Sequence, residues 1–157
     1  MPADRRYPTR LLASGGAAAL LATAVTVAAP ARAAVADSLP FTNCGTGSPA
    51  RVSAVDVDPY PLQAGRDVTV SVRGTLRQRV TGGSYDLRVS YLGAPLLHRS
   101  GRLADVVHLP LPAGDFSLHK RVPVPDQAPP GRYNLTLTAA DQHDDQLLCV
   151  RVPFKVR

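Results

Sequence analysis

Apolar and polar residues alternate along most of the chain after residue 50, which is the pattern of half-buried β-strands. In 67–76, for example, Val68, Val70 and Val72 fall on one face, while Thr69 falls on the other. Fifteen prolines and twelve glycines interrupt the chain, and no helical period is sustained. The alternation predicts seven strands, at 51–57, 67–76, 84–92, 94–99, 116–124, 131–140 and 146–156.

Each predicted strand has a single apolar face, so two sheets must pack together to bury these faces. We therefore predict an all-β fold, a two-sheet immunoglobulin-like β-sandwich of about seven antiparallel strands. Pro123 confines the end of the strand at 116–124 to a sheet edge or a bulge, because proline has no backbone N–H to donate. Tyr133, the second residue after Pro-Pro-Gly, is expected to fix that turn.

The two cysteines constrain the type of sandwich. They are either joined in one disulfide, as is usual in exported chains, or free and buried. The immunoglobulin disulfide crosses the core beside a buried tryptophan, and this chain has no tryptophan. Cys44 precedes the first predicted strand, and Cys149 alternates with Val150, so that it shares a face with Arg151 and Lys155. A Cys44–Cys149 disulfide would therefore lie outside the sandwich and leave the space between the sheets without a crosslink.

The N-terminus has the order of a secretory signal peptide: a basic start, an apolar run and then small residues. The alternative is a membrane anchor, which needs about 18 or more strongly apolar residues, and this run is diluted with Ala, Gly and Thr. Arg5-Arg6 leave both the Sec and the twin-arginine route open. We predict a secreted protein with a signal peptide at 1–33, a short linker at 34–40 and one domain at 41–157.

Charge and motifs argue against several function classes. The net charge of +6 falls to +3 without residues 1–33, which hold four arginines and one aspartate. This charge is too small and too scattered for binding nucleic acid. His98, His108, His119 and His143 lie on separate segments, so no metal site and no cofactor are predicted. No nucleophile, paired-carboxylate or phosphate-loop motif is present, and we predict no catalytic residues.

Four segments in order resemble the ML lipid-recognition family, whose members include the Niemann–Pick type C cholesterol carrier and fungal phosphatidylglycerol/phosphatidylinositol transfer proteins. They are FTNCG (41–45), VDVDPYPLQAG (55–65), VPVPDQAPPGRY (122–133) and ADQHDDQLLCVRVPFKV (140–156). The resemblance covers nearly the whole chain after the predicted signal peptide. Many members carry two further disulfides, for which this chain lacks the cysteines.

The resemblance implies a non-enzymatic carrier that holds a sterol, a fatty acid or a phospholipid chain in an apolar cavity between its sheets, for transfer or sensing. It would be a monomer that contacts membrane surfaces transiently. The predicted cavity lining consists of inward-facing strand residues, namely Val70, Val72, Leu87, Val89, Tyr91, Leu118, Leu135, Leu137, Val150 and Val152. A mouth is predicted at Leu109, Leu111 and Phe116.

Two alternatives remain open from the residues alone. In the first, the same apolar residues form an ordinary filled core, and the protein is a cell-envelope or adhesion-type structural module without ligand. In the second, it inhibits a secreted enzyme. The sequence does not identify the lipid, the donor and acceptor membranes or the oligomeric state.

Overall fold

Two antiparallel sheets make up the fold in the computed structural model, which describes residues 36–157. The first sheet has four strands in the order β1-β3-β4-β7. Their bounds are Asp37–Ser38 (β1), Ala50–Asp58 (β3), Asp67–Leu76 (β4) and Gly114–Pro123 (β7). Valine alternates with polar residues along the first part of β4, and β-branched residues such as valine favour the extended, half-buried surface of a sheet.

The second sheet has five strands in the order β2-β9-β8-β5-β6. Their bounds are Thr42–Asn43 (β2), Ser84–Tyr91 (β5), Ala94–Arg102 (β6), Gly131–Ala140 (β8) and Gln146–Val156 (β9). The all-β prediction is confirmed, and the seven predicted strands correspond to β3–β9. Pro123 ends β7, which is an edge strand, as its missing N–H predicted.

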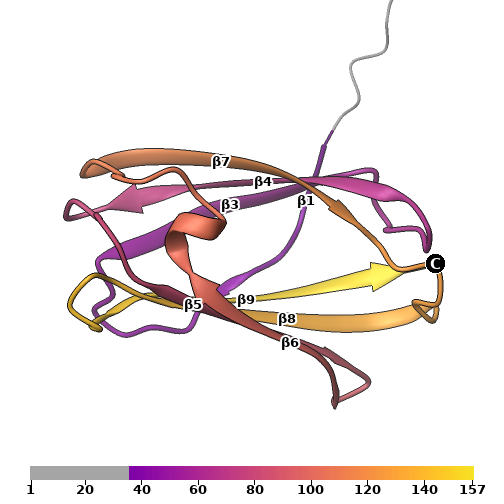
Figure 1. Cartoon of the computed structure of the whole chain (residues 1–157). Coiled ribbons are helices and arrows are strands. Elements are labelled where there is room, and N and C mark those ends of the chain that lie inside the picture. Colours follow the sequence, from indigo (N-terminus) through magenta and orange to yellow (C-terminus); the bar gives the residue numbers. More distant parts are fainter. Residues whose placement is uncertain (1–35) are drawn as a thin grey trace, which may run out of the picture. The chain divides into compact units, whose positions relative to one another are not determined.

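The sheets pack with their apolar faces together, and Figure 1 shows them as two layers, with β3, β4 and β7 in one and β5, β8 and β9 in the other. One buried cluster joins the layers through β3, β4 and β9. Its strand members are Val52, Val55, Val57, Val68, Val150 and Val152. The core therefore lies between β3 and β9, the pair of strands that approach each other across the sandwich.

The N-terminal segment passes from one sheet to the other. β1 pairs with β3 and β2 pairs with β9. Between them Leu39 is 7% exposed and belongs to the buried cluster, and Phe41 packs against it. Residues within the segment predicted as a linker, 34–40, thus form a strand and supply a core side chain. A two-residue strand is too short to produce a detectable alternation. The predicted signal peptide lies outside the described residues.

Loops and one short 3-10 helix, η1 (Leu103–Asp105), cover one end of the sandwich. Leu103 belongs to a second buried cluster, whose other members are Ala50, Leu76, Val80, Ala139 and Leu147. A backbone bridge between Val80 and Leu111 holds the loop after η1 against this cluster. Within residues 36–157, no helix has the length and apolar character needed to cross a membrane.

Candidate functional site

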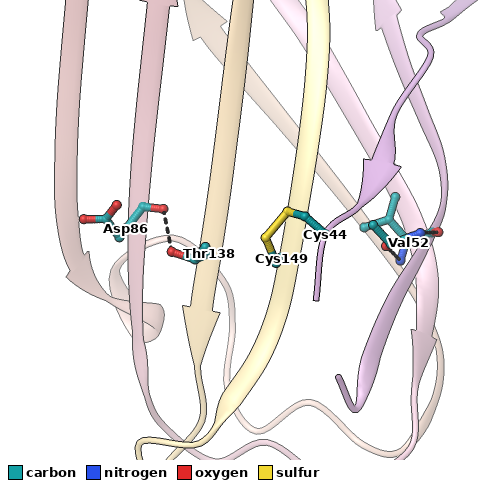
Figure 2. The surroundings of a disulfide bond; sticks show 6 residues. Cys44, Val52, Asp86, Thr138 and Cys149 are labelled. Atoms are coloured by element: carbon teal, nitrogen blue, oxygen red, sulfur yellow. Dashed lines mark hydrogen bonds between the residues drawn. A yellow bond between two sulfur atoms is a disulfide. The ribbon is translucent and has the colours of Figure 1, made fainter. Parts of the chain in front are cut away.

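Cys44 and Cys149 form the predicted disulfide. Cys149 lies in β9 in register with Thr138 of β8, which in turn faces Asp86 of β5, and Figure 2 shows the disulfide beside this row. The row lies on the outer face of the second sheet, because Val150, the next residue along β9, is buried in the core. The disulfide therefore ties the segment after β2 to the outside of β9, as predicted.

Asn43 joins the two sheets next to this disulfide. Its amide nitrogen donates a hydrogen bond to the Val52 carbonyl oxygen over 3.0 Å, and its Oδ1 accepts one from the Val52 N–H over 3.1 Å. Val52 (Figure 2) lies where the pairing of β3 with β4 is interrupted by a bulge. Because β2 and β3 belong to different sheets, both hydrogen bonds cross the sandwich. No sequence pattern indicates this role, since an isolated Asn usually indicates a turn.

Inward-facing side chains of the second sheet become more exposed from β9 toward β6. In one row, Val152 of β9 is 7% exposed, Leu135 of β8 and Val89 of β5 are half-buried, and Leu97 of β6 is 41% exposed. The neighbouring row shows the same trend through Val150, Leu137, Leu87 and Arg99. Residues of one row share one face of the sheet, so the difference reflects what covers that face.

The first sheet shows a matching gradient from β3 to β7. Val55 of β3 is 5% exposed, whereas Val72 of β4 and Leu118 of β7 in the same row are half-buried. The next row runs from buried Val57 through half-buried Val70 to exposed Lys120. We call the side formed by β1, β2, β3 and β9 the closed side, and the side formed by β5, β6 and β7 the open side.

The thirteen predicted lining residues divide among three environments. The first group contributes to the buried cluster at β3 and β9 or packs against it: Val70, Val72, Leu137, Val150 and Val152. The second packs against the cluster beneath the loops: Leu109, Leu111 and Phe116. The third group packs against neither of the two buried clusters found in residues 36–157: Leu87, Val89, Tyr91, Leu118 and Leu135. This third group belongs to β5, β7 and β8, on or next to the open side.

Three inward-facing positions at the open side were missed by sequence reasoning: Leu97, Arg99 and Lys120. Lys120 lies two residues after Leu118, so strand alternation places it on the same inward face. It was missed because a charged residue at this position interrupts the series of apolar residues. Arg99 and Lys120 are exposed, and neither forms an ion pair with another described residue. The open side therefore combines half-exposed apolar side chains with two positive charges.

Two open hollows lie elsewhere on the surface. One, of about 620 Å³, is bordered by polar residues that include Ser84, Asp86, Ser100 and Thr138. The other, of about 500 Å³, lies beside Gln78, Arg79 and the β8–β9 turn. None of the thirteen predicted lining residues borders either hollow.

A family model, described as the ML domain, matches residues 38–156. The chain belongs to the ML domain family. A phosphatidylglycerol/phosphatidylinositol transfer protein of Mycosarcoma maydis is 31% identical over 121 residues, which cover 70% of this ML domain chain and 62% of that relative. The family resemblance proposed from the four sequence segments is thus confirmed.

Solved structures show the same fold for this ML domain chain. A Niemann-Pick type C2 protein from Japanese carpenter ant aligns with a TM-score of 0.59 and 16% identity, over 75% of this chain and 99% of that chain. Chicken MD-1, solved in complex with lipid IVa, aligns with a TM-score of 0.52 and 12% identity, over 74% of this chain and 98% of that one.

The polar groups of the ML domain lie mainly on its outer faces. Asp86 forms a hydrogen bond with His98 and an ion pair with Arg88, and these two partners hold the pKa of Asp86 below its ordinary value against an opposing effect of burial. Among residues 36–157, no three His, Cys, Asp or Glu side chains are grouped to hold a metal ion. These groups flank the sheets from outside and do not line the open side.

Tyr133 has the structural role that its sequence position predicted. Its hydroxyl donates a 2.7 Å hydrogen bond to the Pro129 carbonyl oxygen, and its ring lies 4.9 Å from that of Tyr91 and 5.3 Å from that of Phe154, measured between centroids. Burial, with a smaller effect from Tyr91, raises the pKa of Tyr133. The three rings fill one end of the second sheet, so Tyr91 borders this aromatic stack as well as the open side.

Proposed function

We propose that this ML domain is a secreted, non-enzymatic lipid-binding protein that holds one lipid chain or sterol between its sheets at the open side and transfers it between membranes. The observation that carries the proposal is the gradient of exposure within single rows of side chains. Val152 and Val89 share a row and a face, yet only Val152 is fully buried. A lipid chain lying against Val89 and its open-side neighbours would remove the remaining apolar surface from water.

Burial of a lipid chain would provide enough free energy to offset the cost of association. Each buried methylene contributes about 0.8 kcal/mol, so a sixteen-carbon chain offers roughly 12 kcal/mol. Association costs at least about 4 kcal/mol in lost translational and rotational freedom. The remainder, about 8 kcal/mol, corresponds to micromolar affinity.

The two cations favour an anionic lipid. Lys120 and Arg99 lie on inward faces of the two edge strands that flank the open side. A carboxylate or phosphate of a lipid bound at the open side would be attracted by these positive charges. The relative from Mycosarcoma maydis is named for two phospholipids that are both anionic, and we propose the same charge class here.

Export is part of the same proposal. Residues 1–33 have the order of a signal peptide, and a disulfide is typical of proteins outside the reducing cytosol. Lipid transfer needs no bond making or breaking, and the relative's name describes such a role.

The direct test is ligand uptake. We expect the purified protein, stripped of lipid by extraction, to bind a fluorescent fatty acid, to retain one lipid in native mass spectrometry and to melt at a higher temperature as lipid is added. Val89→Asp should lower the affinity by about tenfold or more, because it places a charge among the apolar rows. Ser90→Asp is the matched control, since it adds the same charge one residue away on the opposite face.

Two results would refute the proposal. The first is a folded wild-type protein that takes up neither fatty acid, phospholipid nor sterol probes. The second is equal loss of affinity in Val89→Asp and Ser90→Asp, because binding would then not depend on the inward face. Lys120→Gln provides the charge test. The Lys120→Gln substitution should weaken the binding of a fatty acid by about fivefold and leave the affinity for the corresponding fatty alcohol unchanged.

A further inference from the structure

The β5–β6 hairpin carries most of the large apolar side chains that are exposed in the described chain. Of the five large apolar side chains exposed in residues 36–157, three lie on it: Leu92 at 75%, Leu96 at 56% and Leu97 at 41%. Single exposed leucines are common on protein surfaces and need no explanation, but three on one hairpin form a patch that indicates an interaction surface.

The turn of this hairpin places Leu92 in a backbone conformation that is unfavourable for leucine. Leu92 and Gly93 join β5 to β6 with φ values of 49° and 87°. Two-residue hairpin turns with positive φ at both positions favour Asn-Gly, and leucine is uncommon in this region. The Leu92 side chain gains little from the core, because it is the most exposed of the five. A strained residue without a packing benefit suggests a functional role.

The hairpin also diverges from the sheet. Val89 pairs with Leu97, but the next residue, Ser90, pairs with Pro95, so Leu96 is an extra residue without a partner in β5. Such a bulge increases the local twist. In Figure 1 the turn between β5 and β6 extends beyond β8, away from the two layers. A Cβ built on Gly93 meets no atom within 4 Å, so the tip is clear of the rest of the described chain.

The charge around the leucines is positive. The segment 87–104 contains Arg88, His98, Arg99 and Arg102 and no acidic residue. Arg88 pairs with Asp86 and Arg102 with Asp105, and the remaining arginine of the segment, Arg99, forms no ion pair within residues 36–157. Exposed leucines beside arginines match the interface of a bilayer that contains anionic lipid, where apolar side chains reach the acyl boundary and cations meet the head groups.

We propose that the β5–β6 hairpin docks this protein on an anionic lipid bilayer, with Leu92 inserted at the interface and Arg99 facing the head groups. Leu97 belongs both to the exposed patch and to the row of Val89 at the open side. Docking therefore brings the open side to the membrane. This inference extends the proposed function by naming the surface through which lipid would be exchanged.

The absence of tryptophan from the chain allows a direct measurement of insertion. Leu92→Trp places a single indole at the turn, and Val106→Trp places one at another exposed apolar position, after η1. Vesicles of phosphatidylcholine with phosphatidylglycerol should shift the Leu92→Trp emission to the blue, and brominated acyl chains should quench it. The Val106→Trp emission should not change. Equal responses at the two positions would overturn the proposal.

Substitutions test the same surface by vesicle flotation. Leu92→Asn should lower binding to phosphatidylglycerol-containing vesicles by about tenfold, because one leucine is lost from the interface. The variant should fold at least as stably as the wild type, because asparagine suits the turn. Arg99→Gln should lower binding by about fivefold and weaken its dependence on salt. Val106→Asn is the control and should bind like the wild type.

The outcomes separate docking from ligand uptake. Wild-type protein that takes up soluble fluorescent fatty acid but does not float with the vesicles would overturn docking and leave the proposed function intact. Vesicle binding that requires Leu92, in a protein that takes up no lipid, would support docking and refute the proposed function. Vesicle binding unchanged in both Leu92→Asn and Arg99→Gln would overturn docking, and a protein partner would then be the alternative occupant of the hairpin surface.

Discussion

The closed and open sides of the sandwich contain the same kinds of strand and differ in what joins them. On the closed side, a disulfide, two hydrogen bonds between Asn43 and Val52 and the buried side chain of Leu39 connect the N-terminal segment to both sheets. On the open side, Leu87, Leu118 and their neighbours face inward without belonging to a buried cluster. The comparison teaches that one side of a sandwich can be tied and tightly packed while the inward-facing side chains of the other side stay half-exposed.

Loss of the disulfide should have the largest effect on this contrast. The bond between Cys44 and Cys149 closes a sequence separation of 105 residues, for which chain entropy gives about 4.7 kcal/mol of stabilisation. We expect the Cys44→Ser, Cys149→Ser double variant to lose that much in urea unfolding. Reductant should destabilise the wild type equally and leave the variant unchanged. A loss below about 1 kcal/mol would contradict the assignment of the closed side as the main source of stability.

Removal of the Asn43 side chain should have the second-largest effect on the free energy of unfolding. Asn43→Ala leaves the N–H and C=O of Val52 without their partners, and unsatisfied groups of this kind cost about 1–3 kcal/mol in the free energy of unfolding. Thr42→Ala, one residue earlier and exposed, should change stability by less than about 0.5 kcal/mol. Equal effects in the two variants would show that Asn43 does not link the sheets.

A matched pair of valines sharpens the comparison further. Val152 and Val89 occupy one row, at the closed and the open side respectively. Val152→Ala should cost about 2 kcal/mol, from lost burial and the cavity left behind, and Val89→Ala less than about 1 kcal/mol. Thermal or urea unfolding without lipid measures both. With fatty acid present, Val89→Ala should lose part of the ligand-induced stabilisation. Equal costs without lipid would mean that the open side is as well packed as the closed side.

Low pH should destabilise the fold through the closed side, by a smaller amount than the substitutions above. The hydrogen bond from Ser38, over 2.5 Å, and then Arg73, over 2.8 Å, hold the pKa of Asp56 below its ordinary value, against an opposing effect of burial. The charged carboxylate therefore stabilises the fold at pH values above the unfolded pKa of about 3.9. This contribution is lost as the pH falls through the lower, folded value.

Asp56→Asn should remove this part of the pH dependence, so that its unfolding free energy approaches that of the wild type near pH 2 and falls below it near pH 7. Urea unfolding across that range is the measurement. Asp86, whose pKa is also lowered, is more exposed and lies on the outer face of β5, a strand of the open side, so Asp86→Asn should have a weaker effect. If Asp86→Asn lowered the unfolding free energy more than Asp56→Asn, the prediction that the closed side contributes more to the pH dependence would be wrong.

Local alternation was sufficient to predict the seven main strands, because the period of two depends only on neighbouring residues. It could also place Cys149 on an outer face, since Val150 beside it is clearly apolar. The predicted lining correctly named inward-facing residues in β4, β5, β7, β8 and β9. Their status as ligand contacts stays a prediction.

The difference between the two sides could not be predicted from the sequence, because it depends on the order of strands in each sheet. Val152 and Val89 are equivalent by local pattern, and only the position of their strands separates buried from half-exposed. β1 and β2 were missed because two residues carry no period. Asn43 was missed because its partner, Val52, is selected by the bulge and by the approach of β3, which are both tertiary features.

The edges of the two sheets determine how this protein behaves among copies of itself. An unpaired strand edge can recruit a strand from another molecule and begin aggregation. Here β6 and β7 each contain a proline, Pro95 or Pro123, which cannot donate a backbone hydrogen bond, and an inward cation, Arg99 or Lys120, which repels an identical strand. β1 and β2 are too short to template another strand. A sandwich whose inward-facing side chains are only half-buried on one side can therefore remain dispersed in concentrated solution, without a neighbour extending its sheets.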